Sequence, residues 1–150
     1  MVTTVGTEDK LDSLLTDLVQ LDHDAVLAYD AAIERLGTAS HRSTLAGFRR
    51  DHLRHIEELD AALLAMGKVP PKDSDMKALL TQGKVVLAGL VGDKAILRAM
   101  KANEDDTNIA YERAVQHRHA SPELRHTLEA GLADERRHRA WLIETIERLG

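Results

Sequence analysis

The sequence contains no cysteine. Disulfide bonds, thiolate nucleophiles, cysteine-based zinc sites and iron–sulfur clusters are therefore excluded. Aromatic residues are also scarce, with one Phe, one Trp and two Tyr in 150 residues, and Gly and Pro number nine and three. This scarcity, together with abundant Ala, Leu, Glu and Arg, favours helices throughout the chain.

Two further absences limit the partners that we expect. No stretch approaches the roughly 18–20 apolar residues that span a bilayer, and no run of Lys or Arg forms a basic patch. The formal net charge of −5 argues against a nucleic-acid surface. The first ten residues lack the basic start and apolar core of a signal peptide, so we expect a cytoplasmic protein without a membrane or nucleic-acid partner.

The first half of the chain predicts a helical hairpin. Apolar residues recur at spacings of three and four in two segments, which predict helices at about 8–36 and 40–66. Glu8 and Asp9 are expected in the first turn of the first helix, where they favour the positive end of its dipole. Gly67 is expected to end the second helix in the left-handed conformation.

The second half predicts the same arrangement after a connection at 68–92. This connection contains two prolines, followed by apolar residues at helical spacing, which indicates a long crossover that carries a short helix. Asp93 is the expected cap of the third long helix. Ser121 followed by Pro122 is the expected start of the fourth, because proline is favoured at the first helical position.

The two halves are related by a repeat. The segment Asp22–Tyr29 aligns with Glu104–Tyr111, 82 residues later, and residues 51–55 align with 134–138, 83 residues later. Two hairpins related in this way predict an all-α four-helix bundle with a pseudo-two-fold axis. We expect a single domain over 1–150, with hairpins at about 8–67 and 93–150 and the crossover at 68–92.

Six side chains of the metal-ligand type interrupt the apolar seams at matching depths. Burying an unpaired carboxylate costs several kcal/mol or neutralises the group, so six such side chains at one level indicate a cation between them. Glu135 and His138 are three residues apart on one helix face and can bind the same metal cluster. The candidate ligands are Asp22, His52, His55, Glu104, Glu135 and His138.

This pattern resembles the ferritin-like superfamily, with bacterioferritin and rubrerythrin as the nearest pattern matches. The shared features are an acidic residue with Tyr seven residues later on the first and third helices, and Glu-x-x-His on the fourth with a counterpart on the second. The resemblance covers about residues 11–149. It implies a ferritin-like bundle with a non-haem di-iron-type site, two irons per chain, and manganese or zinc as substitutes. It also implies an iron-dependent oxidoreductase of the ferroxidase or peroxidase type.

The resemblance further implies a role for each residue. Glu135 would bridge two metals. Each metal would also bind one carboxylate and one imidazole, and a tyrosine of the opposite hairpin would hydrogen-bond each carboxylate. The carboxylates are Asp22 and Glu104, the imidazoles His55 and His138, and the tyrosines Tyr29 and Tyr111.

Two positions depart from the family's pattern. Asp22 is one methylene shorter than the usual Glu, and His52 stands where the pattern has a second bridging Glu. Three carboxylates and three imidazoles make the ligand set one charge less negative than usual, which favours a higher potential or lower occupancy of the second metal position. A single metal or an asymmetric pair therefore stays open. Asp51 points about 100° away on the helix, and we do not expect it to replace the missing carboxylate.

Two functions without turnover stand beside this one. In the first, the acids pair with Arg54, Arg137 or protonated histidines, and the chain is a stress-associated or scaffold bundle. In the second, a His-rich half-site buffers zinc or manganese. The missing cysteines exclude the electron-donating iron domain of a rubrerythrin. Because the chain stops at Gly150 without the fifth helix of cage ferritins, we expect a homodimer instead of a storage shell.

Overall fold

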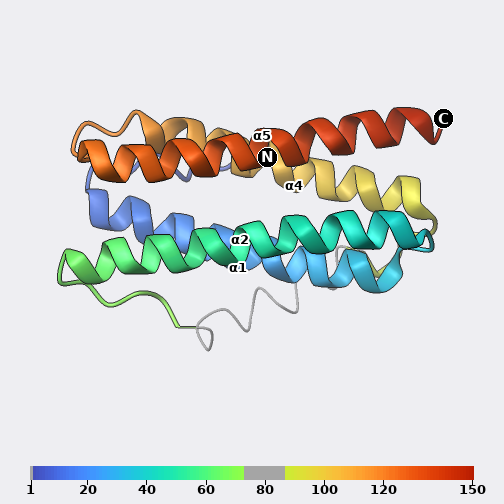
Figure 1. The fold of residues 1–150 in the computed structure, drawn as a ribbon, viewed down its shortest axis with the longest axis horizontal. Helices are drawn as coiled ribbons and strands as arrows, with labels where there is room; N and C mark the ends of the chain where they lie inside the picture. Colours follow the sequence, from blue (N-terminus) through green and yellow to red (C-terminus); the bar gives the residue numbers. More distant parts are fainter. Residues whose placement is uncertain (1, 73–86) are drawn as a thin grey trace.

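The structure, a computed structural model, describes residues 2–72 and 87–150, and the regular structure in these residues is helical. The long helices are α1 (Leu11–Arg35), α2 (Ala39–Ala65), α4 (Asp93–Val115) and α5 (Pro122–Arg148). As Figure 1 shows, α1 and α2 form one antiparallel hairpin and α4 and α5 form the other. The predicted all-α helical bundle is confirmed.

The connection between the hairpins joins opposite ends of the bundle. α2 and α4 run in the same direction, so α2 ends at one end and α4 begins at the other (Figure 1). The short helix predicted within this crossover falls mostly on residues 73–86, outside the described residues. Leu87, which follows them, is buried in an apolar cluster with Leu97 and Met100. The last part of the crossover therefore packs against the bundle.

Two of the predicted helix ends are confirmed in detail. The Oγ atom of Ser121 accepts a hydrogen bond of 3.1 Å from the N–H of Leu124, and so caps the start of α5. Gly67 has a φ of 75°, and the N–H of Lys68 beyond it donates to the carbonyl of Leu63 at 2.9 Å. This left-handed ending of α2 needs the conformational freedom of glycine.

The predicted start of the first helix is wrong. α1 begins at Leu11, and Asp12 is the acidic residue of its first turn. Glu8 lies before the helix, where its carboxylate accepts a hydrogen bond of 2.7 Å from the N–H of Gly6. This local hydrogen bond holds Glu8 in the segment that precedes the helix.

Asp93 does not cap its own helix, because it is the first residue of α4. Its carboxylate accepts hydrogen bonds from the N–H groups of Gly37 at 2.8 Å and Thr38 at 3.1 Å, and lies 2.9 Å from Nδ1 of His41. Burial raises the pKa of Asp93, but hydrogen bonds from Thr38, Gly37 and His41 outweigh it and lower the pKa to about 2. Asp93 thus ties the start of α4 to the turn between α1 and α2.

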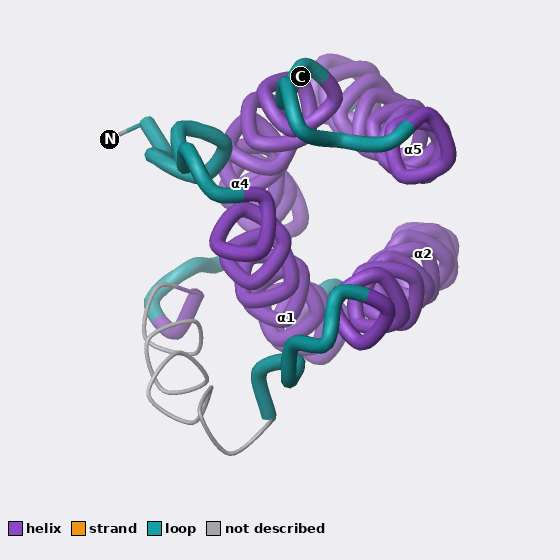
Figure 2. The backbone as a smooth tube through the Cα atoms, turned by 90° about the vertical axis from the view of Figure 1, so that its left-hand side faces the viewer, coloured by secondary structure: helices purple, strands orange, loops and turns teal. Residues whose placement is uncertain are grey.

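The core contains two apolar clusters with a polar layer between them. One cluster surrounds Leu18 and Leu59, and the other surrounds Ala32 and Leu45. In the view along the bundle, α1 adjoins α4, whereas α2 and α5 make less contact with each other (Figure 2). Among the described residues, no helix combines the length and the apolar character that crossing a bilayer requires.

Candidate metal centre

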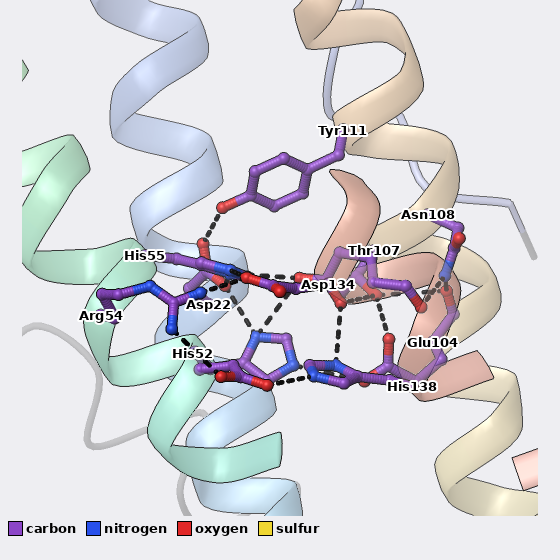
Figure 3. Close-up of polar contacts among 12 residues, drawn as sticks. Asp22, His52, Arg54, His55, Glu104, Thr107, Asn108, Tyr111, Asp134 and His138 are labelled. Atoms are coloured by element: carbon purple, nitrogen blue, oxygen red, sulfur yellow. Dashed lines mark hydrogen bonds and ion pairs between the residues drawn. The ribbon is translucent and has the colours of Figure 1, made fainter. Parts of the chain in front are cut away.

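The predicted ligands are buried inside the bundle and lie close to one another, in a polar layer between the apolar clusters. Figure 3 shows this arrangement for Asp22, His52, His55, Glu104 and His138. They come from all four helices. The exposed fraction is 0% for His52, Glu135 and His138, 1% for Asp22 and Glu104, and 2% for His55. In a layer without access to water, each of these charges needs a compensating partner.

The ligand atoms form two overlapping groups of four. Within each group, the candidate donor atoms lie within 4.8 Å of one another. His52 and Glu135 belong to both groups, and they are also counterparts in the repeat. Four nitrogen and oxygen donors at this spacing suit a divalent transition-metal ion. The first group is Asp22, His52, His55 and Glu135, and the second is His52, Glu104, Glu135 and His138.

The Asp22 carboxylate is held by three neighbours. Its Oδ1 atom lies 2.8 Å from Nδ1 of His52 and 3.3 Å from Nδ1 of His55, while Tyr111 donates to Oδ2 at 2.6 Å. Burial raises the pKa of Asp22, but the hydrogen bonds with His52 and His55 outweigh it and lower the pKa. Asp22 is therefore a carboxylate whose position is fixed from both hairpins.

Glu104 has similar surroundings in the second hairpin. Its Oε1 atom lies 3.2 Å from Nε2 of His52 and 3.3 Å from Nδ1 of His138, and accepts a hydrogen bond from Tyr29. Thr107 donates to Oε2 at 2.9 Å. Burial raises the pKa of Glu104, but the neighbouring imidazoles of His138 and His52 lower it well below the usual value. Each tyrosine thus hydrogen-bonds a carboxylate of the opposite hairpin.

The histidines at the two ends of the cluster direct Nδ1 inward and Nε2 outward. Nδ1 of His55 lies 3.4 Å from Oε1 of Glu135, and its Nε2 lies 2.9 Å from Oδ2 of Asp134. Nδ1 of His138 lies 3.5 Å from Oε2 of Glu135, and its Nε2 lies 2.8 Å from Oδ2 of Asp51. A carboxylate on Nε2–H orients a neutral imidazole so that Nδ1 offers its lone pair to the centre of the cluster.

Asp51 and Asp134 were not among the predicted site residues. Each also accepts hydrogen bonds from Arg54 and Arg137, which join α2 to α5 over the cluster. Arg54 and Arg137, the arginines expected to neutralise the buried carboxylates in a metal-free bundle, therefore pair with these outer aspartates. Among the described residues, neither arginine forms an ion pair with Asp22, Glu104 or Glu135. The internal repeat could have indicated these two aspartates, because each directly precedes one of the two aligned ligand motifs.

The cluster is balanced in charge without a metal. Burial lowers the pKa of His55, but the neighbouring carboxylates of Asp22 and Glu135 raise it to about 10. In the same way, burial lowers the pKa of His138, while Glu104 and Glu135 raise it to about 9. Three protonated imidazoles would offset three carboxylates, so a metal ion that binds here has to displace protons.

Two buried atoms of the cluster have no hydrogen-bond partner within residues 2–72 and 87–150. They are Oε1 of Glu135 and Nδ1 of His138. Burial is the main reason why the pKa of Glu135 is raised. A buried carboxylate oxygen and imidazole nitrogen without partners are destabilising in a purely polar core, whereas both are normal metal ligands. The residues present therefore fit a bound cation.

One protein family matches most of the chain. Residues 11–117 match the family described as "Domain of unknown function (DUF2383)". The chain belongs to this family. The match to DUF2383 includes α1, α2 and α4 and ends before α5, which carries Glu135 and His138. No curated protein and no solved structure matches the chain.

Proposed function

We propose that this protein is a ferritin-like metal protein with a non-haem di-iron-type site in the middle of the bundle. The observation that carries the proposal is the pair of overlapping ligand groups that share His52 and Glu135. The topology supports it as well, because ferritin-like bundles join two helical hairpins by one long crossover.

The proposal assigns each ligand by its group. Glu135 and His52 would belong to both metal positions, with His52 at the place of the usual second bridging carboxylate. Asp22 and His55 would complete one metal position, and Glu104 and His138 the other. Tyr29 and Tyr111 hold the terminal carboxylates through their hydroxyl groups.

Iron is the metal that we propose, with manganese or zinc as substitutes, because imidazole and carboxylate ligands together suit these ions. When bound, iron would supply the redox chemistry for Fe(II) oxidation by oxygen or peroxide, or for peroxide reduction. The protein's share is to fix the ligands and to keep the layer dry. Phe48 contributes to this, since it stacks on His138 with 4.2 Å between the ring centroids.

A second candidate function is metal buffering without turnover, and two observations favour it. Because His52 stands in place of a carboxylate, the ligand set attracts a second, highly charged metal ion less strongly. The histidines also balance the carboxylates in the absence of metal, so the bundle can persist empty as a scaffold. An enzyme should consume peroxide or oxidise Fe(II) at its full metal content, whereas a buffer should bind metal without turnover.

Metal analysis of natively expressed protein tests the proposal, with an anomalous-scattering map to locate the ions. We expect two irons per chain. Glu135→Ala should lose both metals because its carboxylate belongs to both groups, and His138→Ala should also prevent loading. Glu129→Ala, on the exposed part of α5, is the control and should keep its metal. Unchanged metal content in the first two variants would refute the assignment.

We further propose that residues 1–150 form one ferritin-like domain that acts as a cytoplasmic homodimer. The dimer is supported by Val91, an apolar side chain that is 91% exposed and would be covered at a dimer contact. Leu87, by contrast, is already buried within the chain. Light scattering at several concentrations measures the mass in solution. A mass of one chain at all concentrations would rule out the dimer.

A further inference from the structure

The two ligand groups contain the same kinds of ligand. Each has two imidazoles and two carboxylates. The end histidines are also supported alike, because Nε2 of His55 and Nε2 of His138 lie 2.9 Å and 2.8 Å from the carboxylates of the outer aspartates. Neither the ligand charge nor this support therefore distinguishes the two metal positions. A difference in affinity between them would depend on how firmly their carboxylates are held.

A buried polar pair on α4 has no polar counterpart in the first hairpin. Thr107 is 2% exposed and Asn108 is 7% exposed. In the register of the repeat, 82 residues earlier, their counterparts are Ala25 and Val26. Buried polar side chains cost free energy unless they are hydrogen-bonded, so the partners of this pair indicate what it does.

Thr107 contacts the carboxylates of two candidate ligands. Its Oγ1 atom lies 2.9 Å from Oε2 of Glu104 and 3.1 Å from Oε2 of Glu135, and Figure 3 shows Thr107 beside Glu104. The other oxygen of Glu104, Oε1, faces Nδ1 of His138 at 3.3 Å. Oε1 of Glu135 faces Nδ1 of His55 at 3.4 Å. The hydroxyl of Thr107 therefore fixes the orientation of both carboxylates relative to the histidines.

A single hydroxyl between two carboxylates favours a bound cation. The hydroxyl of Thr107 has one hydrogen atom and can donate to only one carboxylate at a time. Two anionic groups at one hydroxyl repel each other, and a cation next to both removes this repulsion. Thr107 thus holds Glu104 and Glu135 where one metal ion can bind both of them.

Asn108 holds the same two ligands through their backbone. Its Nδ2 atom donates to the carbonyl of Glu104 at 2.7 Å and to the carbonyl of Glu135 at 3.0 Å. These hydrogen bonds join α4 to α5 at the level of the cluster, so the two glutamates keep their relative position. Ligands that are held in place before binding lose less conformational freedom when the metal ion binds.

The carboxylate of the other metal position is held by fewer groups. Apart from the ligand histidines, the donor to Asp22 among the described residues is Tyr111, at 2.6 Å. Glu104 has two such donors, Tyr29 on Oε1 and Thr107 on Oε2. The metal position that contains Glu104 is therefore the better fixed of the two.

We propose that Thr107 and Asn108 are positioning residues, which make the position of Glu104 and His138 bind its metal ion more tightly, so that this position fills first. This inference rests on the proposed function, because it presupposes a metal site. It adds two residues that act through the ligands and an order in which the two positions are occupied.

Crystals of the metal-free protein, soaked with a substoichiometric amount of Co(II), test the order. An anomalous-scattering map should show the stronger peak beside Glu104 and His138 and the weaker peak beside Asp22 and His55. Equal peaks, or the stronger peak beside Asp22, would overturn the inference and leave the metal site intact.

Substitutions of Thr107 test its role. Thr107→Val removes the hydroxyl at nearly the same volume, and we expect the dissociation constant of the first Co(II) ion to rise about tenfold or more. Competition with a chelator of known affinity measures this constant. The visible absorption of bound Co(II) should also change, because Oε2 of Glu104 loses its hydrogen bond and the carboxylate can turn. Thr107→Ser keeps the hydroxyl and should bind Co(II) as tightly as the wild type.

The matched control is Thr16→Val, the same substitution in α1. The hydroxyl of Thr16 donates to the backbone carbonyl of Asp12 at 2.9 Å, so this variant should bind Co(II) as the wild type does. Asn108→Val copies the first hairpin and should weaken binding of the first ion by about tenfold. If Thr107→Val does not fold, as judged by circular dichroism, Thr107→Ala and Asn108→Val carry the test.

The possible outcomes separate the two proposals. Unchanged affinity in Thr107→Val and Asn108→Val, or a Thr107→Ser variant as weak as Thr107→Val, would overturn the positioning role while the metal site stands. A wild-type protein that binds no Co(II) at all would overturn the proposed function itself.

Discussion

Nε2 of His138 lies 2.8 Å from Oδ2 of Asp51, a residue of the other hairpin. The repeat gives the matching pair, His55 and Asp134, at 2.9 Å. Both aspartates also accept hydrogen bonds from the arginines that join α2 to α5. The orientation of the two end histidines and the contact between the hairpins therefore depend on the same two carboxylates.

Asp51→Asn and Asp134→Asn should each weaken metal binding about 10- to 100-fold, which is the usual effect of removing the carboxylate behind a ligating histidine. The amide can still accept a hydrogen bond but no longer supports the imidazole with a charge. Competition with a chelator of known affinity measures the dissociation constant. Asp105→Asn is the control, because Asp105 pairs with Lys101 and Arg139 away from the cluster. An equal loss in the control would contradict the role given to Asp51 and Asp134.

His52→Glu should strengthen binding of the second metal ion, because it adds a carboxylate between the two ligand groups. We expect the second dissociation constant to fall by about tenfold or more and the reduction potential to become more negative. In the presence of chelator the variant should melt at a lower temperature than the wild type, since four carboxylates then share two imidazoles. Metal titration, potentiometry and calorimetry measure these quantities. His126→Glu, at an exposed position of α5, should change none of them.

Gly131→Ala should destabilise the bundle by about 1–3 kcal/mol through overpacking. The new Cβ would lie 2.6 Å from Cε1 of Tyr111, whose hydroxyl is fixed on Asp22. Gly47→Ala is a matched control inside α2, because its Cβ would meet only the flexible end of Arg50 at 3.5 Å. This control should be stabilised by up to about 1 kcal/mol from helix propensity. Urea unfolding measures both changes, and the same sign for both would contradict the packing argument.

Asp93→Asn should change how the free energy of unfolding depends on pH under acidic conditions. The pKa of Asp93 in the folded chain, about 2, lies below the usual 3.8, so the carboxylate stabilises the fold above pH 4. That stabilisation disappears as the pH falls from about 4 to 2. By linkage it amounts to about 2 kcal/mol near neutral pH. The difference between wild type and variant in the free energy of unfolding should therefore be constant above pH 5 and shrink towards pH 2.

The sequence predicted the bodies of the helices because apolar residues repeat at helical spacing, and it predicted their ends less well. Acidic residues close to a helix start have other uses, which a local pattern does not reveal. Glu8 accepts the N–H of Gly6 instead of entering the helix, and Asp93 serves a turn 56 residues away. Ser121 and Gly67 behave as predicted because their interactions are local.

The candidate ligands converge in one layer, as their matched depth in the sequence indicated, while their role as ligands stays a prediction. The partners outside this layer could not be derived in the same way. A view of one helix shows that Asp51 points away from the seam, but not that this direction faces His138 on α5.

Neither hairpin carries a complete ligand group. Each group takes three residues from one hairpin and the fourth, His52 or Glu135, from the other. An ancestor that consisted of a single hairpin would therefore have had such a site only where two copies met. Divergence between the two halves of such a repeat would account for a histidine and a glutamate at the two shared positions.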